Sequence, residues 1–336
     1  MPLRIFSAEY RRLLTPQGLA HRQLVNIRPG IGLLTYITNC FPEQMTLTIT
    51  GYSTALFSTW YFIEELRLLF DAGDGVSASL LQKSRKIDHI FISHADRDHV
   101  TGLLRLNELN AREGFPQLFF PADSGSFPAL ETFSKQLDER VKQTRWTPVR
   151  ADEHVEIQND TFVKSVRNNH VIRAQPHEVK SLGYQVYQVR HKLKPDLLSL
   201  PGETLRQLAS DIGRENMTYE VRTNLLAYSG DTPIENFEQW DTTGILIHEA
   251  TFLTNDEFAG LDMNRNRHST LESVLQIVAD LRIDILILGH FSSRYSHAEI
   301  DEAIRRFCKQ FRVKIPVYRL LPGQIHRDIL NEEPIN

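Results

Sequence analysis

Short apolar runs alternate with amphipathic stretches from about residue 46 to the C-terminus, and this alternation predicts an α/β protein. Several runs end abruptly in acidic residues or histidines. These runs are residues 66–70, 89–93, 224–228, 244–247 and 285–288. Loops at the C-terminal ends of strands can carry polar groups without burying unpaired backbone. We therefore expect these polar side chains to gather at one edge of the fold.

Two amphipathic helices are predicted near the C-terminus, and both should pack on a sheet. The first follows Ser269, with Glu272 three residues later, and the second follows Ser296, with Glu299 three residues later. Each pair has the spacing of a capping box, in which side chains satisfy the free backbone groups at the start of a helix. Apolar residues then recur at helical spacing in both segments.

Two regions lack this regular pattern. Residues 1–45 carry turn signals and weak periodicity, and are predicted to be an N-terminal extension packed on a main domain of residues 46–336. Residues 190–220 are polar and contain Pro195, Pro201, Gly202 and Gly213. This composition predicts a long surface excursion.

Composition narrows the class of protein. Among 336 residues, 38 Lys and Arg oppose 42 Asp and Glu, for a net charge of -4, which argues against binding nucleic acid by bulk positive charge. A local basic patch stays open. The two cysteines, Cys40 and Cys308, have no metal-type spacing and form no disulfide framework. Together with the absence of a secretion-type apolar run near the N-terminus and of an apolar membrane span, they favour a cytoplasmic location.

Four potential metal ligands lie within six residues directly after the run 89–93. They are His94, Asp96, Asp98 and His99. Two carboxylates and two imidazoles held together would shift one another's pKa values, and divalent cations would relieve this crowding by supplying opposite charge. A solvated acidic loop with helix-capping aspartates is the alternative interpretation of this segment alone.

Further candidate ligands make the solvated-loop interpretation weaker. They lie at or near predicted strand ends, and are His177, Asp231, His248, Glu249, His268 and His290. His170 is ambiguous, because Asn168-Asn169-His170 has the character of a turn.

Seven motifs in order resemble the ribonuclease Z-like branch of the metallo-β-lactamase superfamily. The first three are Leu69-Phe70-Asp71-Ala72-Gly73-Asp74-Gly75, the segment 94–99, which is similar to His-x-His-x-Asp-His, and the segment 177–184, which is similar to His-x-Val-x-Ser-x-Gly-Tyr. The remaining four are segments 228–232, 247–252, 267–270 and 289–295. The third motif favours His177 over His170 as a site residue.

The resemblance implies an αββα sandwich of two facing mixed β-sheets flanked by helices, with two divalent metal ions at one edge. One ion would take His94, Asp96 and His177. The other would take Asp98, His99 and His290, with Asp231 bridging both ions. Such a pair of ions can activate a shared hydroxide and neutralise the attacking and leaving oxygens.

The resemblance also assigns catalytic roles. Asp98 would orient the hydroxide, His268 would donate a proton to the leaving oxygen, and Glu249 would polarise His268. Position 96 departs from the family, which has His there. An oxygen ligand shifts the preference of that site from zinc, the expected ion, towards manganese or iron.

The motifs leave three alternative functions open. The first is a metal-dependent phosphodiesterase of the ribonuclease Z type, acting on RNA 3′ ends or a small phosphodiester, without a membrane partner and as a homodimer. The second is a hydrolase of a non-nucleic ester or lactone on the same scaffold. The third is a non-hydrolytic diiron or inactive scaffold, supported only by Asp96. The segment 185–221 replaces the Gly/Pro-rich arm with which family members grip tRNA, so weak tRNA processing is expected.

Overall fold

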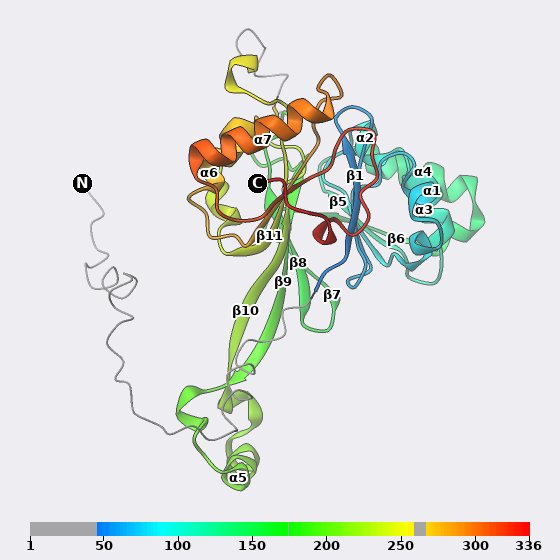
Figure 1. Cartoon of the computed structure of the whole chain (residues 1–336). Helices are drawn as coiled ribbons and strands as arrows, with labels where there is room; N and C mark the ends of the chain where they lie inside the picture. Colours follow the sequence, from blue (N-terminus) through cyan, green and yellow to red (C-terminus); the bar gives the residue numbers. More distant parts are fainter. Residues whose placement is uncertain (1–45, 174, 259–266) are drawn as a thin grey trace. The chain divides into compact units, whose positions relative to one another are not determined.

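Two mixed β-sheets face each other in the computed structural model, with helices on their outer sides, and this confirms the predicted α/β sandwich (Figure 1). The structure describes residues 46–173, 175–258 and 267–336. Residues from Leu47 to Asn336 form one unit. The predicted N-terminal extension, residues 1–45, lies outside the described residues.

The first sheet has six strands in chain order. They are β1 (Ile49–Thr54), β2 (Ser58–Ile63), β3 (Leu68–Phe70), β4 (His89–Phe91), β5 (Gln117–Pro121) and β6 (Arg145–Val149). β1, β2 and β3 pair antiparallel, whereas β3 to β6 pair parallel. The helices in this half are α1 (Val76–Leu80), α2 (Arg97–Val100), α3 (Leu103–Asn110) and α4 (Ser126–Leu137).

The second sheet has seven strands in the order β13-β12-β11-β10-β9-β8-β7. They are β7 (His154–Gln158), β8 (Thr161–Arg167), β9 (Leu182–Leu193), β10 (Thr218–Tyr228), β11 (Thr243–Glu249), β12 (Ile285–Gly289) and β13 (Val317–Arg319). β10 to β13 pair parallel and β7 to β10 antiparallel. The helices here are α5 (Gly202–Ile212), α6 (Leu271–Val278) and α7 (His297–Phe311).

Alternation along the strands builds two kinds of core. In β2, Trp60 and Phe62 point to a cluster that includes residues of α1 and α3, whereas Tyr61 points into the space between the sheets. Aromatic rings fill that space. The ring centroids of Phe70 in β3 and Tyr228 in β10 lie 5.1 Å apart. This aromatic layer joins the two sheets directly beneath the edge where the polar residues gather.

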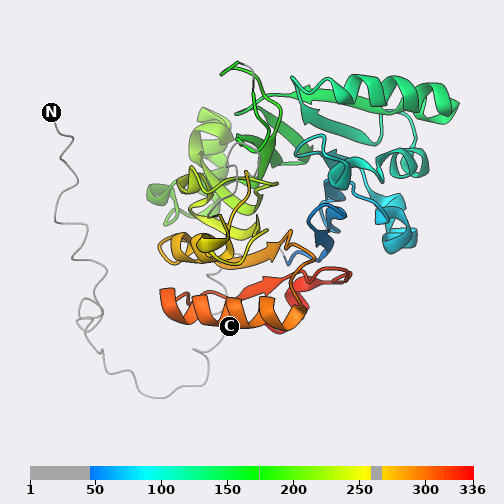
Figure 2. The same ribbon diagram turned by 90° about the horizontal axis from the view of Figure 1, so that it is seen from above.

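The two predicted C-terminal helices, α6 and α7, cover the outer face of the second sheet (Figures 1 and 2). α7 has the predicted capping box between Ser296 and Glu299. α6 is capped by Thr270 and not by Ser269 as predicted. The Ser269 hydroxyl instead donates to the carbonyl of Thr232, so it joins two loops at the sheet edge.

The predicted excursion, residues 190–220, is more regular than expected. β9 and β10 continue as a paired hairpin, with Leu193 opposite Thr218, and carry α5 at the far end (Figure 1). We call residues 190–220 the arm. α5 has no buried residue. None of the helices in the described part of the chain is both long and apolar enough to span a bilayer.

Candidate metal centre and active site

Polar residues gather at one edge of the sandwich because five strands of the two sheets end there. Asp71 follows β3, and the segment 94–99 follows β4. From the second sheet, Asp231 follows β10, Glu249 ends β11 and His290 follows β12. The polar clusters that the sequence placed at strand ends are therefore neighbours in space, as expected.

Close backbone contacts hold the segment 94–99 in place. The Ala72 N–H donates to the carbonyl of His99 at 2.8 Å, and the Gly102 N–H donates to the carbonyl of Ala72 at 2.8 Å. A Cβ at Gly73 would lie 2.4 Å from the Asp98 carbonyl oxygen, and one at Gly102 would lie 2.3 Å from the Gly73 carbonyl oxygen. Both positions therefore require glycine for the two loops to pack this closely.

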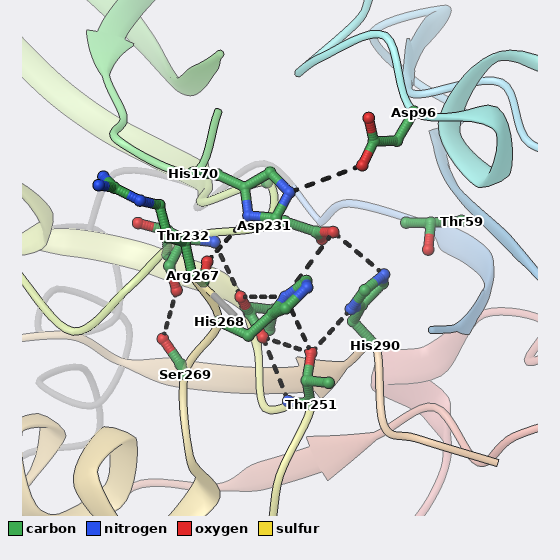
Figure 3. Close-up of polar contacts among 12 residues, drawn as sticks. Thr59, Asp96, His170, Asp231, Thr232, Thr251, Arg267, His268, Ser269 and His290 are labelled. Atoms are coloured by element: carbon green, nitrogen blue, oxygen red, sulfur yellow. Dashed lines mark hydrogen bonds and ion pairs between the residues drawn. The ribbon is translucent and has the colours of Figure 1, made fainter. Parts of the chain in front are cut away.

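The ligand atoms form two groups that meet at Asp231. In the first, Oδ2 of Asp96 lies 3.5 Å from Nε2 of His94 and 3.8 Å from Nε2 of His170. In the second, Oδ2 of Asp98 lies 3.6 Å from Nε2 of His99 and 3.4 Å from Nε2 of His290. Figure 3 shows the contacts of Asp96 with His170 and of Asp231 with His290.

Asp231 links the two groups through one oxygen. Its Oδ2 lies 3.8 Å from Nε2 of His94 in the first group. The same oxygen lies 3.3 Å from Nε2 of His99 and 3.2 Å from Nε2 of His290 in the second. Burial acts to raise the pKa of Asp231, but His290 and His99 hold that pKa well below its ordinary value. Asp231 is therefore a carboxylate, as a bridging ligand must be.

These residues fit a pair of divalent cations. Donor atoms that share one ion at about 2.1 Å lie roughly 3.4 Å apart in tetrahedral geometry, which matches the separations within each group. Nε2 of His94 and Nε2 of His99 are buried without a hydrogen-bond partner among the described residues. A buried imidazole nitrogen without a partner is costly, and a bound cation would satisfy it.

Hydrogen bonds orient the four imidazoles in the same sense. Nδ1 of His99 donates to Asp71 at 2.7 Å, and Nδ1 of His170 donates to the Arg267 carbonyl at 2.8 Å. Nδ1 of His94 contacts the Ser93 hydroxyl and Nδ1 of His290 contacts the Thr251 hydroxyl, both at 2.9 Å. These hydroxyls donate their own protons to Asp71 and Glu249, so each imidazole Nδ1 is the donor. Each Nε2 therefore presents a lone pair to the centre.

His268 and Glu249 form a pair beside the second group. Nδ1 of His268 lies 3.0 Å from Oε1 of Glu249, which also accepts from the Thr232 N–H at 2.8 Å. Burial disfavours the charged imidazole, but the carboxylates of Glu249 and Asp231 together outweigh burial and raise the pKa of His268 to about 9. His268 is thus a protonated group whose Nε2 is left to act as a donor.

Of the two candidates His177 and His170, the structure brings His170 to this centre and leaves His177 outside it. The His177 side chain is exposed, and it belongs to none of the metal-compatible groups among the described residues. His170 takes its place because Asn168 turns the chain directly after β8. The Asn168 Oδ1 accepts from the His170 N–H at 2.7 Å, and its Nδ2 donates to the carbonyls of Ser229 and Asp231 at 2.9 and 2.7 Å.

Sequence reasoning also missed the residues that orient the ligands. Asp71, Ser93, Thr251 and Asn168 are buried beside the centre, although none was singled out for this task. Their position along the chain was the available signal, because Asp71 and Asn168 directly follow β3 and β8, and Ser93 lies two residues after β4. His248 has no such role: it is buried and stacks on Phe237, with ring centroids 4.8 Å apart.

Comparisons with known proteins agree with this geometry. The family model of the β-lactamase superfamily domain matches residues 66–210 of this chain. A chloroplastic tRNase Z of Arabidopsis thaliana is 26% identical over 281 residues, which span 81% of this chain and 75% of that protein. The chain is also similar to the ribonuclease Z of Methanocaldococcus jannaschii, with 28% identity over 271 residues, 72% of this chain and 82% of the relative.

Solved structures support the superfamily fold. A metallo-β-lactamase fold protein of Bacillus subtilis has a TM-score of 0.55 at 14% identity, over 84% of this chain and 98% of that one. The short form of human tRNase Z has a TM-score of 0.52 at 18% identity, over 84% and 99%. At these identities the likeness concerns the fold alone.

Proposed function

We propose that the protein is a metal-dependent phosphodiesterase of the ribonuclease Z type that hydrolyses RNA. The observation that carries this proposal is the pair of ligand groups joined at Asp231, with the hydrogen-bonded pair of His268 and Glu249 beside them. The relatives named ribonuclease Z and tRNase Z cover most of this chain and support the same reaction class. An acid next to a two-metal centre suits a leaving alkoxide oxygen, which must gain a proton.

Two divalent cations are the cofactors that the donor set supports. His94, Asp96 and His170 would hold the first, and Asp98, His99 and His290 the second, with Asp231 shared. When bound, such a pair supplies Lewis acidity that makes a water nucleophilic near neutral pH and offsets the charge of the phosphate. The buried orphan nitrogens and the three aspartates need this positive charge.

The side chains of the chain perform the remaining tasks. Asp98 is fixed by the Leu56 N–H, which donates to its Oδ2 at 3.0 Å, so this carboxylate can orient the attacking water. His268 donates a proton from Nε2 to the leaving oxygen, and Glu249 holds the imidazole at Nδ1. Thr251 connects the pair of His268 and Glu249 to the second ligand group, since its hydroxyl contacts both Glu249 and His290.

Asp96 sets the identity of the first ion. With Asp96 as a ligand, each group contributes two imidazoles and one terminal carboxylate, and the centre carries three carboxylates in all. Hard oxygen donors suit manganese and iron(II) better than a site of imidazoles alone would. We propose zinc as the expected ion of the centre, with manganese or iron as competitors because Asp96 adds an oxygen donor.

RNA recognition by the arm should be weak. Residues 190–220 contain five Lys and Arg and five Asp and Glu, so the arm as a whole is neutral. Phosphate contacts would rest on a few exposed cations, among them Lys192, Lys194, Arg206 and Arg214. A homodimer and a cytoplasmic location stay predictions from the sequence.

A chromogenic phosphodiester and an RNA substrate test the proposal together. Bis(p-nitrophenyl) phosphate should be hydrolysed with added zinc or manganese, and precursor tRNA should be cleaved more weakly and with strong salt sensitivity. Turnover of a lactone or carboxylic ester with no phosphodiester activity under either metal would contradict the proposal. Robust cleavage at the tRNA 3′ end would contradict only the prediction of weak RNA recognition.

A further inference from the structure

A pocket of about 520 Å³ lies between the end of β1 and the start of α7. None of the proposed metal ligands or the His268–Glu249 pair lines it. Its walls come from three parts of the chain, with Tyr52, Thr54 and Phe57 from the β1–β2 hairpin, Ser293, Tyr295, Ser296 and His297 from the loop before α7 and its first residue, and Pro322 and Gly323 after β13.

The β1–β2 hairpin turn, which forms the first wall of the pocket, also contacts the metal centre. Leu56 lies in the hairpin turn with a φ of 70°, a conformation that non-glycine residues rarely adopt. This conformation accompanies a contact with the centre, because the Leu56 N–H donates to Oδ2 of Asp98 at 3.0 Å. The next residue, Phe57, lines the pocket. The turn therefore lies between the second ligand group and the pocket.

The second wall also begins at a ligand. The loop that lines the pocket starts directly after His290, whose N–H donates to the Ser53 hydroxyl of β1 at 2.8 Å. The Ala55 N–H donates to the Phe291 carbonyl at 3.2 Å, which ties this loop to the hairpin turn. A substrate bound at the centre would thus have the pocket next to it, across a turn of three residues.

The pocket is built to take a flat, partly polar group. Phe57 presents its ring to solvent with 61% of the residue exposed. The Tyr295 ring is fixed, because its hydroxyl donates to Glu257. Ser293 adds a hydroxyl group, and the Thr54 hydroxyl, which accepts from the Gly323 N–H at 3.1 Å, can still donate. Exposed aromatic rings bind unstacked bases by stacking, and hydroxyls can then meet the polar edge of the base.

We propose that this pocket binds the nucleobase of the nucleotide next to the scissile phosphodiester. The inference rests on the proposed function, because it needs a nucleotide held at the centre. Phe57 is then a specificity-determining residue that stacks on the base, and Tyr52 and Tyr295 form the side walls. The hairpin turn serves both purposes: its Leu56 N–H fixes Asp98, and its Phe57 ring receives the base.

Calorimetric titration of the metal-loaded protein with AMP and with ribose 5-phosphate tests the pocket without any cleavage step. AMP should bind about tenfold more tightly than ribose 5-phosphate, since stacking of one base contributes an effect of this order. Phe57→Ala should remove this preference and leave ribose 5-phosphate binding unchanged, and Phe57→Tyr should retain it. Phe133→Ala is the matched control, because Phe133 is a 53% exposed phenylalanine on α4, outside the pocket.

Parallel assays with bis(p-nitrophenyl) phosphate separate the two proposals. If the protein cleaves this compound but binds AMP and ribose 5-phosphate equally, or if Phe57→Ala keeps the preference, the pocket assignment is wrong and the proposed function stands. If the protein cleaves no phosphodiester with zinc or manganese, the proposed function fails, and the assignment of the pocket to that reaction fails with it.

Discussion

The metal centre and the arm differ in how much of their geometry the fold determines. At the centre, the four imidazoles have their Nδ1 atoms engaged by a carboxylate, a hydroxyl or a carbonyl, and all but Asp96 of the proposed ligands are largely buried. In the arm, α5 has no buried residue and the charged side chains are exposed and balanced. The same hairpin strands, β9 and β10, connect the two regions.

This difference separates the chemistry from the choice of substrate. Ligands that are held before any ion binds lose little entropy on binding it, so the reaction should depend steeply on each residue of the centre. Exposed charges contribute little individually and are screened by salt. Changes at the centre should therefore stop turnover on every substrate, whereas changes in the arm should affect only large ones.

The largest effect is expected for Asp98→Ala. This change removes a proposed ligand of the second group and the carboxylate that would orient the attacking water, so kcat on bis(p-nitrophenyl) phosphate should fall by about 10³-fold or more. Steady-state kinetics with added metal measure the loss. A decrease of less than about tenfold would show that Asp98 has neither role.

The His268→Ala variant should lose rate but keep its metal. Removal of the general acid should lower kcat by about 10²-fold, whereas the metal content measured by mass spectrometry should match that of the wild type. His154→Ala is a suitable control, because His154 lies on β7, outside the metal-compatible groups of the described residues. Full activity of the His268→Ala protein would disprove the acid role.

Removal of the metal should destabilise the fold. Asp96, Asp98 and Asp231 repel one another without a cation, and an ion that binds only the folded state at 100-fold above its dissociation constant adds about 2.7 kcal/mol of stability. Chelation should then lower the melting temperature by roughly 5–10 °C in a thermal unfolding assay. An arm variant such as Lys192→Ala should show the same decrease, and an unchanged melting temperature on chelation would argue against a bound ion.

Asp96→His should sharpen the contrast within the centre itself. It replaces an oxygen donor by an imidazole, so the zinc affinity of the first group should rise by roughly tenfold. Mutation of residues that support metal ligands changes metal affinity by a factor of about this size. Competition with a chromogenic chelator measures this affinity. Unchanged zinc binding would mean that Asp96, whose side chain is 61% exposed, does not contact the ion.

The smallest effect is expected in the arm. The double change Lys192→Ala with Lys194→Ala should weaken RNA binding a few-fold and make its salt dependence less steep by about one to two ions. Hydrolysis of bis(p-nitrophenyl) phosphate should stay at the wild-type rate. Glu215→Ala, on the same arm, should instead strengthen RNA binding. Loss of activity on both substrates in the lysine variant would contradict the separation of the two regions.

The sequence predicted the strand ends and the motif order well, because both are local patterns. β10 ends at the predicted residue, β11 and β12 end within two residues of the predicted positions, and the α7 capping box is in place. The sequence motif favoured His177 over His170, and the structure places His170 at the centre for a physical reason. The choice between His170 and His177 depends on the Asn168 side chain, which donates to two carbonyls of the loop after β10, more than 60 positions away. A motif comparison does not contain that contact. The continued pairing of β9 with β10 in a polar segment is non-local in the same way.

Anomalous X-ray diffraction from crystals soaked with zinc or manganese tests the central claim most directly. The account predicts two peaks on either side of the Asp231 carboxylate, one bound by His94, Asp96 and His170 and the other by Asp98, His99 and His290. A single peak, or a first ion that His177 binds while His170 points away, would contradict it.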